Sequence, residues 1–332
     1  MKHLTILVPD TQTVISTISC ICGTYDFFST ANAYRKKKGK SPLFKIEMAG
    51  VSDKSEFAGG MVAIMPARNI SSIRKTDLIV IPSLECDFKK IQKGNISLTN
   101  WVKDQYENGA EVASMCTGAY MLASAGLLNG RNCSVHWNAA ENLKNLFPEV
   151  RLKIEKLITD EQGIYTNGGG YSFLNLLIYL VEKYYDRQTA IYCSKIFQVD
   201  MDRITQNDFA IFTPQKSHGD EVVKKAQAYI ENNFFEKISV EEVSQKFAVG
   251  RRNFDRRFVK ATGNTPLEYL QRVKIESAKK ALETSNKNIS EVMYEVGYSD
   301  IKAFREIFKR ITGLSPLGYK NKYNKEAELV YS

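Results

Sequence analysis

One pattern of residues is written twice in the last third of this 332-residue chain, between Ile238 and Tyr323. Four apolar residues recur 49 positions later: Val240, Val243, Phe247 and Val249 return as Ile289, Val292, Val296 and Tyr298. Five more recur 50 positions later: Phe254, Phe258, Thr262, Gly263 and Pro266 return as Phe304, Phe308, Thr312, Gly313 and Pro316. A repeat that keeps its apolar positions and gains one residue at a turn is a duplicated supersecondary unit. Each unit reads as helix, short turn and helix, which predicts two helix-turn-helix motifs.

The second helix of the first copy concentrates positive charge, with five basic residues and one acidic residue in Arg251 to Lys260. Phe254 and Phe258 stand about one helical turn apart and are expected to face inward. That phase turns four polar residues outward: Arg251, Arg252, Asn253 and Arg256. Arg and Asn recognise guanine and adenine edges with paired hydrogen bonds, so we expect this helix to bind double-stranded DNA.

The matching helix of the second copy is less basic. Ser299 is expected to cap its start, and five residues are expected to face DNA: Ser299, Asp300, Lys302, Arg305 and Lys309. Fewer basic residues predict more positioning on the phosphate backbone and less readout of bases. The alternative for both helices is a merely solvated charged face, which the duplication of a basic helix disfavours.

The region from Asp220 to Tyr323 resembles the AraC/XylS family of bacterial transcriptional regulators. The resemblance rests on three motifs: Pro266-Leu267-Glu268-Tyr269, Val296-Gly297-Tyr298-Ser299-Asp300 and Thr312-Gly313-Leu314-Ser315-Pro316. It implies an all-α DNA-binding domain at residues 220–325, whose two reading helices enter successive major-groove segments on one face of the DNA.

Residues 1–200 alternate short apolar runs with helical segments, which predicts a doubly wound α/β sheet. The expected strands are His3 to Pro9, Phe44 to Ala49, Met61 to Met65, Asp77 to Pro82 and Ala110 to Met115. One helix is expected to end near Lys38, and another to run from Trp101 to Asn108 with Gly109 closing it.

Cys116 follows the last of these strands and leads into a helix through Cys116-Thr117-Gly118. A turn of this kind holds a side chain at the carboxyl end of a strand, above the N–H groups of a helix start. Those groups lower the pKa of a thiol and form an anion-binding cup. The sequence therefore places any chemistry of this domain at Cys116.

Residues 1–200 resemble the PfpI-like, glutamine-amidotransferase-like superfamily. The resemblance rests on the segments 113–119, 125–131, His136-Trp137 and 166–170. It implies a ligand-sensing or dimerisation domain. The residues expected to contact a ligand are Cys116, Thr117, His136, Asn167, Gly168 and Gly169.

Three features argue against catalysis at Cys116. His136 is the only candidate base and has no acid evident beside it. Enzymes of the superfamily usually carry an acid where this chain has Cys20, and often a Gly-Gly turn where it has Ser83-Leu84. We expect a non-catalytic domain; the alternatives are a thiol-dependent amidase or hydratase-like enzyme and a cysteine redox sensor, both using Cys116.

Structural roles compete with ligand binding at each of these positions. Cys116 could be a small buried hydrophobe, and His136 a core histidine whose hydrogen bonds are satisfied. The segment Asn167 to Gly170 could be a tight turn that needs positive φ. The apolar helix from Tyr171 to Tyr185 could be buried in its own domain or shared with a second subunit, which makes a homodimer a hypothesis.

Residues 201–219 are expected to form a linker, because periodicity fades and polar residues gather there. Gln206, Phe209 and Phe212 are expected to pin it to one domain.

The net charge of +9 suits a polyanionic partner. The chain shows no apolar run of about 18 residues and no signal peptide, so neither a membrane span nor secretion is expected. Its six cysteines are irregularly spaced, as in reduced cytoplasmic proteins, and no metal or cofactor is expected.

Overall fold

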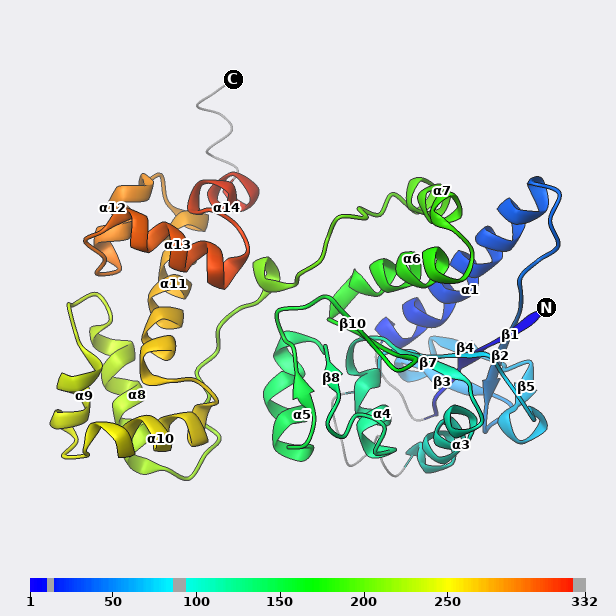
Figure 1. Ribbon diagram of the computed structural model, residues 1–332, viewed down its shortest axis with the longest axis horizontal. Coiled ribbons are helices and arrows are strands. Elements are labelled where there is room, and N and C mark those ends of the chain that lie inside the picture. The colour runs from blue at the N-terminus through cyan, green and yellow to red at the C-terminus, as the bar shows by residue number, and fades with distance from the viewer. Residues whose placement is uncertain (11–14, 86–93, 325–332) are drawn as a thin grey trace, which may run out of the picture. The chain divides into compact units, whose positions relative to one another are not determined.

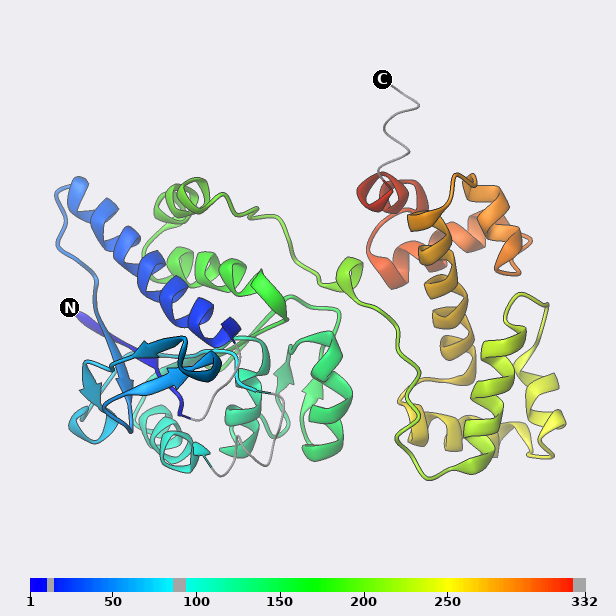
Figure 2. The same cartoon turned by 180° about the vertical axis from the view of Figure 1, so that it is seen from behind.

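The computed structural model describes residues 1–10, 15–85 and 94–324, and the chain divides into two compact units, Met1–Gln206 and Asn207–Ser332 (Figures 1 and 2). The boundary falls inside the segment expected to be a linker. Residues 201–206 belong to the first unit and residues 207–219 to the second. Cys86 lies outside the described residues; the other five cysteines are free thiols.

The first unit is built on a seven-stranded sheet in the order β10-β11-β7-β6-β1-β2-β5. The strands are β1 Lys2–Leu7, β2 Phe44–Gly50, β5 Arg68–Asn69, β6 Leu78–Ile81, β7 Glu111–Ser114, β10 Ile158–Glu161 and β11 Ile164–Asn167. All neighbouring strands run parallel except β10, which is antiparallel to β11. The predicted doubly wound α/β fold is confirmed.

Helices cover both faces of this sheet, as Figures 1 and 2 show. They are α1 Ile15–Lys37, α3 Ile96–Glu107, α4 Ala119–Ser124, α5 Ala140–Leu146, α6 Phe173–Tyr184 and α7 Arg187–Phe197. Within β6, Leu78 and Val80 join the core under α1, α6 and α7, whereas Ile79 and Ile81 join the core under α3, α4 and α5. Successive side chains of a strand point to opposite faces, so a strand buried on both faces is apolar throughout.

One predicted strand lies outside the main sheet. The run from Met61 to Met65 forms β4 Val62–Ile64, which pairs only with β3 Ser55–Phe57 in a separate two-stranded sheet. Its side chains are exposed or half-exposed, so this apolar run is not part of the core. Another small sheet pairs β8 Asn132–Cys133 with β9 Arg151–Leu152.

Helix α6 is largely buried within its own unit, as one of the two interpretations of the apolar segment from Tyr171 to Tyr185 expects. Seven of its twelve residues are buried. It packs against α1 and α7 on one side of the sheet. The single chain therefore covers most of this helix.

Over residues 207–324 the second unit contains helices and no β-strand. Its helices are α8 Glu221–Asn233, α9 Val240–Lys246, α10 Arg251–Thr262, α11 Pro266–Thr284, α12 Ile289–Glu295, α13 Ile301–Thr312 and α14 Pro316–Tyr323. The pairs α9–α10 and α12–α13 form the two predicted helix-turn-helix motifs. The phenylalanines that α10 and α13 contribute to the repeat, Phe254, Phe258, Phe304 and Phe308, are fully buried.

Helix α11 packs against both motifs. Tyr269 and Leu270 in its first half pack in the core of the first motif, and Ile275, Ala278 and Leu282 in its second half pack in the core of the second. Pro266 and Pro316 open α11 and α14, where a missing N–H costs no helix bond. The repeat therefore folds as two small cores on one continuous helix.

The helix caps of the second unit correct one prediction. Ser239 caps α9 and forms a capping box with Glu242, as its sequence indicates. The prediction that Ser299 caps α13 is wrong. Asp300 occupies the cap and accepts from the N–H groups of Lys302 and Ala303 at 2.7 and 3.3 Å. A carboxylate at this position also gains from the positive end of the helix dipole.

Residues 207–219, which we call the strap, lie along the helices of the second unit. Its backbone is held at Asp208 by Tyr323 (3.0 Å), at Ala210 by Lys279 (2.7 Å) and at Gln215 by Gln227 (2.7 Å). The prediction that all three anchors pin the linker to one domain is wrong. Gln206 is buried in the first unit, whereas Phe212 packs on Tyr269 in the second.

Candidate DNA-binding and effector sites

Helix α10 presents its polar residues to solvent, as its sequence predicts. Arg251, Arg252, Asn253 and Arg256 are all exposed, on the side away from the buried phenylalanines. They are not equally available, however. Arg251 pairs with Asp255 at 3.0 Å and approaches Glu241 at 3.8 Å, and Arg256 donates to the Asn253 side chain at 3.1 Å. Arg252 is therefore the arginine of this face that we expect to reach a base edge most readily.

One arginine of α10 has a structural role that the sequence did not indicate. Arg257 donates two hydrogen bonds to Asp220, at 2.8 and 2.6 Å, and Asp220 also caps α8 by accepting from the N–H of Val223. These hydrogen bonds hold the pKa of the Asp220 carboxyl below its usual value. Arg257 thus joins the reading helix to α8, and its charge is matched within the protein.

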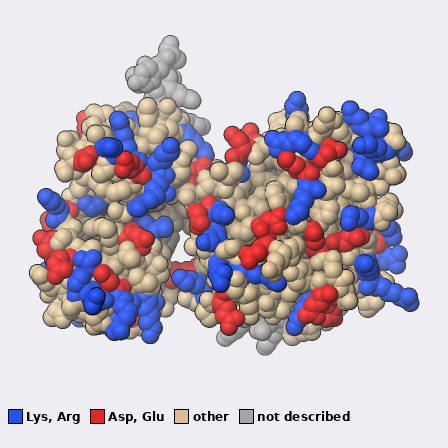
Figure 3. Space-filling model, in the orientation of Figure 1, with Lys and Arg blue, Asp and Glu red and all other residues tan. Residues whose placement is uncertain are grey.

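Helix α13 and the two residues before it form a second exposed polar face, which carries Ser299, Asp300, Lys302, Arg305 and Lys309. The carboxylate of Asp300 accepts the hydrogen bonds of the helix cap, so we do not expect it to contact DNA directly. Arg310, which is also exposed, donates to Gln271 of α11 at 2.6 Å. Figure 3 shows Lys and Arg side chains gathered over α10 and along α13. Basic groups that face one polyanion displace its condensed counterions, which drives binding at low salt.

Cys116 stands in a strained turn at the carboxyl end of β7. Its φ of +53° lies in the left-handed region, which costs a residue with a side chain about 1–3 kcal/mol. Two residues on, a Cβ at Gly118 would lie 2.6 Å from the carbonyl oxygen of Pro82, so only glycine fits. The thiol is partly exposed. The sequence-predicted placement of Cys116 at a strand-to-helix turn is confirmed.

The side chain of Thr117 forms hydrogen bonds within the protein. Its side chain is buried, and its hydroxyl donates to the carbonyl of Leu84 at 2.5 Å and accepts from the N–H of the same residue at 2.9 Å. These two bonds fix the segment that follows β6. The geometry gives Thr117 a positioning role beside the Cys116 turn.

The segment 167–170 also packs inward. Asn167 is fully buried, and its amide donates to the carbonyls of Leu157 and Ser172, both at 3.2 Å. A Cβ at Gly168 would lie 2.9 Å from the side chain of Gln206. Positive φ is required only at Gly170, at +63°. The interpretation of this segment as a turn that needs positive φ therefore holds at Gly170. At Gly168, close packing against Gln206 is what requires a glycine.

His136 lies against Gly169, where a Cβ would come within 1.6 Å of its ring. Its Nδ1 accepts from the backbone N–H of Asn138 at 3.1 Å, and burial lowers its pKa. These contacts hold the ring in place and favour the neutral imidazole.

The position expected to carry an acid carries a buried thiol. Cys20 donates to the Ser83 hydroxyl at 3.7 Å, and burial raises its pKa to about 11. Cys116 is near enough to raise that pKa further. A neutral thiol can neither polarise a histidine nor take a proton at neutral pH. Cys20 is therefore no proton-transfer partner for Cys116 at neutral pH.

Comparison with known proteins agrees with both halves of the fold. Residues 26–177 match the DJ-1/PfpI family, and residues 243–322 match a helix-turn-helix domain family. The chain is an AraC-type transcriptional regulator with a DJ-1/PfpI domain. It is 23% identical over 278 residues to the HTH-type transcriptional regulator GbdR of Pseudomonas aeruginosa, covering 82% of this chain and 74% of GbdR.

Other relatives carry similar names. The HTH-type transcriptional regulator ArgR of Pseudomonas aeruginosa is 26% identical over 223 residues, which cover 66% of this chain and 67% of ArgR. A Vibrio parahaemolyticus protein described as a candidate transcriptional regulator has a crystal structure with a TM-score of 0.52. It is 21% identical and covers 59% of this chain and 98% of its own. At that identity the similarity shows the fold alone.

Among the described residues, no helix has the length and apolar character needed to cross a membrane.

Proposed function

We propose that this regulator binds an operator through α10 and α13 and responds to a small molecule held by its DJ-1/PfpI domain, without catalysing a reaction. The observation that carries the DNA part is the paired outward faces of α10 and α13. Each is polar and basic, and each is backed by two buried phenylalanines of the same repeat. Two such faces, on motifs that one helix joins, suit two adjacent segments of a major groove.

The two helices proposed to bind DNA differ in the side chains that they expose. Helix α10 offers Arg252, Asn253 and Arg256, whose forked side chains suit guanine and adenine edges. Helix α13 offers Lys302, Arg305 and Lys309, and lysine acts as a point charge that suits phosphate. We therefore assign most of the base discrimination to α10 and most of the backbone positioning to α13.

The direct test is fluorescence anisotropy of the full-length protein on a labelled duplex taken from the region upstream of its own gene. A shuffled duplex of the same composition is the control. We expect tighter binding to the upstream duplex than to the shuffled one, and a ratio that persists as salt is raised, because base contacts survive screening better than phosphate contacts. Equal binding to both duplexes at every salt concentration would contradict the proposal.

We propose a cytoplasmic homodimer as the working form. Most of helix α6 is covered by its own unit, so we assign the contact to another surface. Ile191 and Ile196 on α7 are 37% and 53% exposed and make this helix the better candidate. Light scattering after size-exclusion chromatography gives the mass directly. A dimer that an Ile196→Glu change dissociates supports this contact, and a monomeric wild type contradicts it.

A thiol-dependent function is the second candidate, because Cys116 stands in a strained, partly exposed turn. The buried thiol of Cys20 and the neutral His136 oppose enzymatic chemistry there. Substituting Cys116→Ala separates the functions. Retained regulation of a reporter gene in that variant supports sensing without catalysis, whereas loss of turnover on an amide or aldehyde substrate would establish an enzyme. A peroxide-dependent change in DNA affinity that Cys116→Ser removes would establish a redox sensor.

A further inference from the structure

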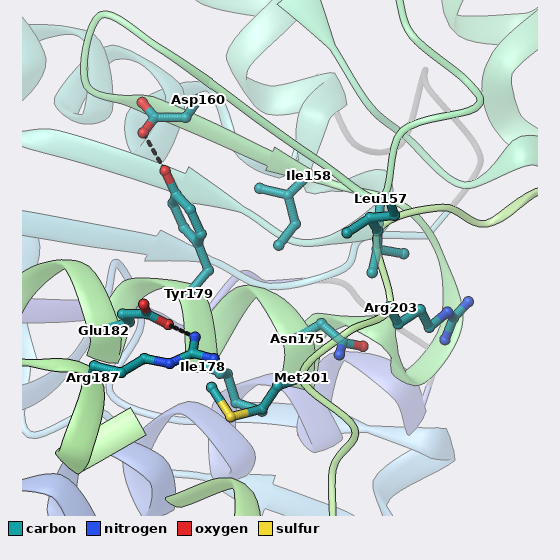
Figure 4. Close-up of a pocket in the computed structure, with 11 residues that line it drawn as sticks. Leu157, Ile158, Asp160, Asn175, Ile178, Tyr179, Glu182, Arg187, Met201 and Arg203 are labelled. Carbon is teal, nitrogen blue, oxygen red and sulfur yellow. Dashed lines mark hydrogen bonds and ion pairs between the residues drawn. The ribbon is translucent and has the colours of Figure 1, made fainter. Parts of the chain in front are cut away.

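The first unit contains a cavity of about 270 Å³, whose walls come mainly from β10, α6 and residues 201–204 (Figure 4). Two acids on its rim are matched by groups of the protein. Asp160 accepts from the hydroxyl of Tyr179 at 2.6 Å, and Glu182 pairs with Arg187 at 2.6 Å. Because these charges are matched internally, the cavity does not indicate one class of ligand.

In the second unit, the two helix-turn-helix motifs touch each other at a point outside the helix that they share. The loop of residues 234–239, which joins α8 to α9, lies beside the turn after α12 (Figures 1 and 2). A Cβ on Gly297, in that turn, would lie 2.4 Å from the carbonyl oxygen of Phe235. Phe234 packs against the cores of both motifs. We call this contact between residues 234–239 and Gly297–Tyr298 the junction.

The first copy of the repeat has the same turn without this contact. Ala248 stands 49 positions before Gly297, between α9 and α10. Both residues have positive φ, +52° for Ala248 and +74° for Gly297, and each donates its N–H to the carbonyl three residues before it. The turn of the first motif carries a side chain, because Ala248 is exposed. In the second motif, the close approach of Phe235 excludes one.

Lys274 of α11 lies inside the junction and is 6% exposed. Its ammonium donates to the carbonyl of Gly297 at 2.9 Å and makes a longer contact of 3.5 Å with the carbonyl of Glu236. It also stands 5.1 Å from the centre of the Tyr298 ring, within the range of a cation–π interaction. One ammonium thus links the shared helix to a loop of the first motif and to the turn of the second.

A contact beside the shared helix fixes an angle that the helix alone leaves free. A motif held only by its packing on α11 can turn about the axis of that helix, and this turn would swing α13 relative to α10. Two helices that bind successive major-groove segments need half-sites one turn of DNA apart, about 10–10.5 base pairs. A change of the angle between the motifs would change the separation of half-sites that the protein fits.

We propose that Lys274 and the junction set the separation of the two half-sites that one chain recognises. Lys274 is a positioning residue, because it is buried and acts through the placement of α13 relative to α10. The proposal rests on the proposed function, in which both helices bind one operator. It adds selectivity for the distance between half-sites to the base discrimination assigned to α10.

In vitro selection with the full-length protein on a library of random DNA duplexes tests the proposal. We expect wild type to enrich two half-sites at one fixed separation. Lys274→Met keeps an apolar side chain but removes the N–H donors, so it should enrich the same half-sites at several separations. On a selected duplex, one base pair inserted between the half-sites should weaken wild-type binding about tenfold or more, and Lys274→Met binding about threefold or less.

Gly297→Asn changes the junction from its other side. Asparagine tolerates positive φ better than most residues, so its main effect is the contact of its Cβ with Phe235, and several separations are expected again. Ala248→Asn places the same residue in the matching turn of the first motif and should keep one separation. Leu282→Ala, which removes a buried side chain from the core of the second motif, should lower the melting temperature and also keep one separation.

Four results would overturn the assignment. They are one unchanged separation in both Lys274→Met and Gly297→Asn, equal broadening by Leu282→Ala, enrichment of a single half-site by wild type, and wild-type binding that an inserted base pair does not weaken. Circular dichroism shows whether each variant is folded, and Gly297→Asn carries the comparison if Lys274→Met is not. Each of these results leaves specific DNA binding intact, whereas enrichment of no sequence by wild type would contradict the proposed function and this inference with it.

Discussion

The ammonium of Lys279 donates a 2.7 Å hydrogen bond to the carbonyl oxygen of Ala210 and so joins the helix shared by both DNA-binding motifs to the strap. Lys279 also pairs with Glu276 at 2.8 Å, and the same carboxylate oxygen accepts from the N–H of Phe212 at 3.0 Å. The lysine side chain is 5% exposed and the glutamate 14%. The strap is therefore held to α11 by a buried charged pair.

Replacing Lys279 with Met should destabilise α11 and the strap by about 3 kcal/mol, because Glu276 is left buried without its partner. Amide hydrogen exchange of α11 in the full-length protein measures the free energy of opening. Lys287→Met, which breaks an exposed pair with Glu295, is the control and should cost less than about 1 kcal/mol. Equal effects of the two changes would contradict the role given to Lys279. The double variant Lys279→Met/Glu276→Gln should recover part of the loss.

The stability of the second unit should depend on the charge of Asp220. Its pKa is lowered in the folded protein by the hydrogen bonds from Arg257, so its contribution is complete above the unfolded value of about 3.9 and disappears as pH falls through the lower folded value. Asp220→Asn keeps a helix cap but removes the charge, and should flatten the melting temperature across this acidic range. Asp220→Ala should cost about 1 kcal/mol more through the lost cap. An unchanged acid profile in Asp220→Asn would refute the pairing.

Gly169 should tolerate no side chain while His136 is present. The Cβ of Gly169→Ala would lie 1.6 Å from the imidazole ring, so the ring or the backbone must move. Overpacking of this kind costs about 1–3 kcal/mol, measured by urea denaturation. The double variant Gly169→Ala/His136→Ala should be more stable than the sum of the two single changes predicts. Strict additivity would show that the ring and the glycine do not interact.

Cys116 should gain stability when its strain is relieved. Glycine adopts a φ of +53° at little cost, whereas alanine does not. We therefore expect Cys116→Gly to be about 1 kcal/mol more stable than Cys116→Ala by thermal denaturation. Comparing these two variants removes the thiol from both, so the difference reports the backbone. A less stable glycine variant would mean that the turn is not strained.

The sequence predicted the features that depend on local spacing. The burial of Phe254 and Phe258 followed from helical periodicity, and the buried strands at residues 4–7 and 78–81 followed from short, mainly apolar runs. The cap at Asp300 was missed because Ser299 and Asp300 are both good capping residues and adjacent in sequence.

Features that depend on distant contacts could not be predicted in this way. The sequence predicts that Thr117 contacts a ligand, and only its two hydrogen bonds with Leu84 show that its side chain packs inside the domain. The strap looks like a polar linker because it is held mainly through its own backbone carbonyl groups, which leave no pattern in the sequence. The cavity joins residues 157–160, 175–187 and 201–204, which approach one another only in the folded domain.

The unequal roles of the two reading helices are tested most directly by comparing Arg252→Ala with Lys302→Ala. The measured quantity is the ratio of affinities for the operator duplex and a shuffled duplex, at one fixed salt concentration. Arg252→Ala should lower this ratio by about 1–3 kcal/mol, or roughly five- to 150-fold, because a base contact is lost. Lys302→Ala should weaken both duplexes together and leave the ratio nearly unchanged. If both variants lower affinity for the two duplexes equally, α10 does not carry the base discrimination.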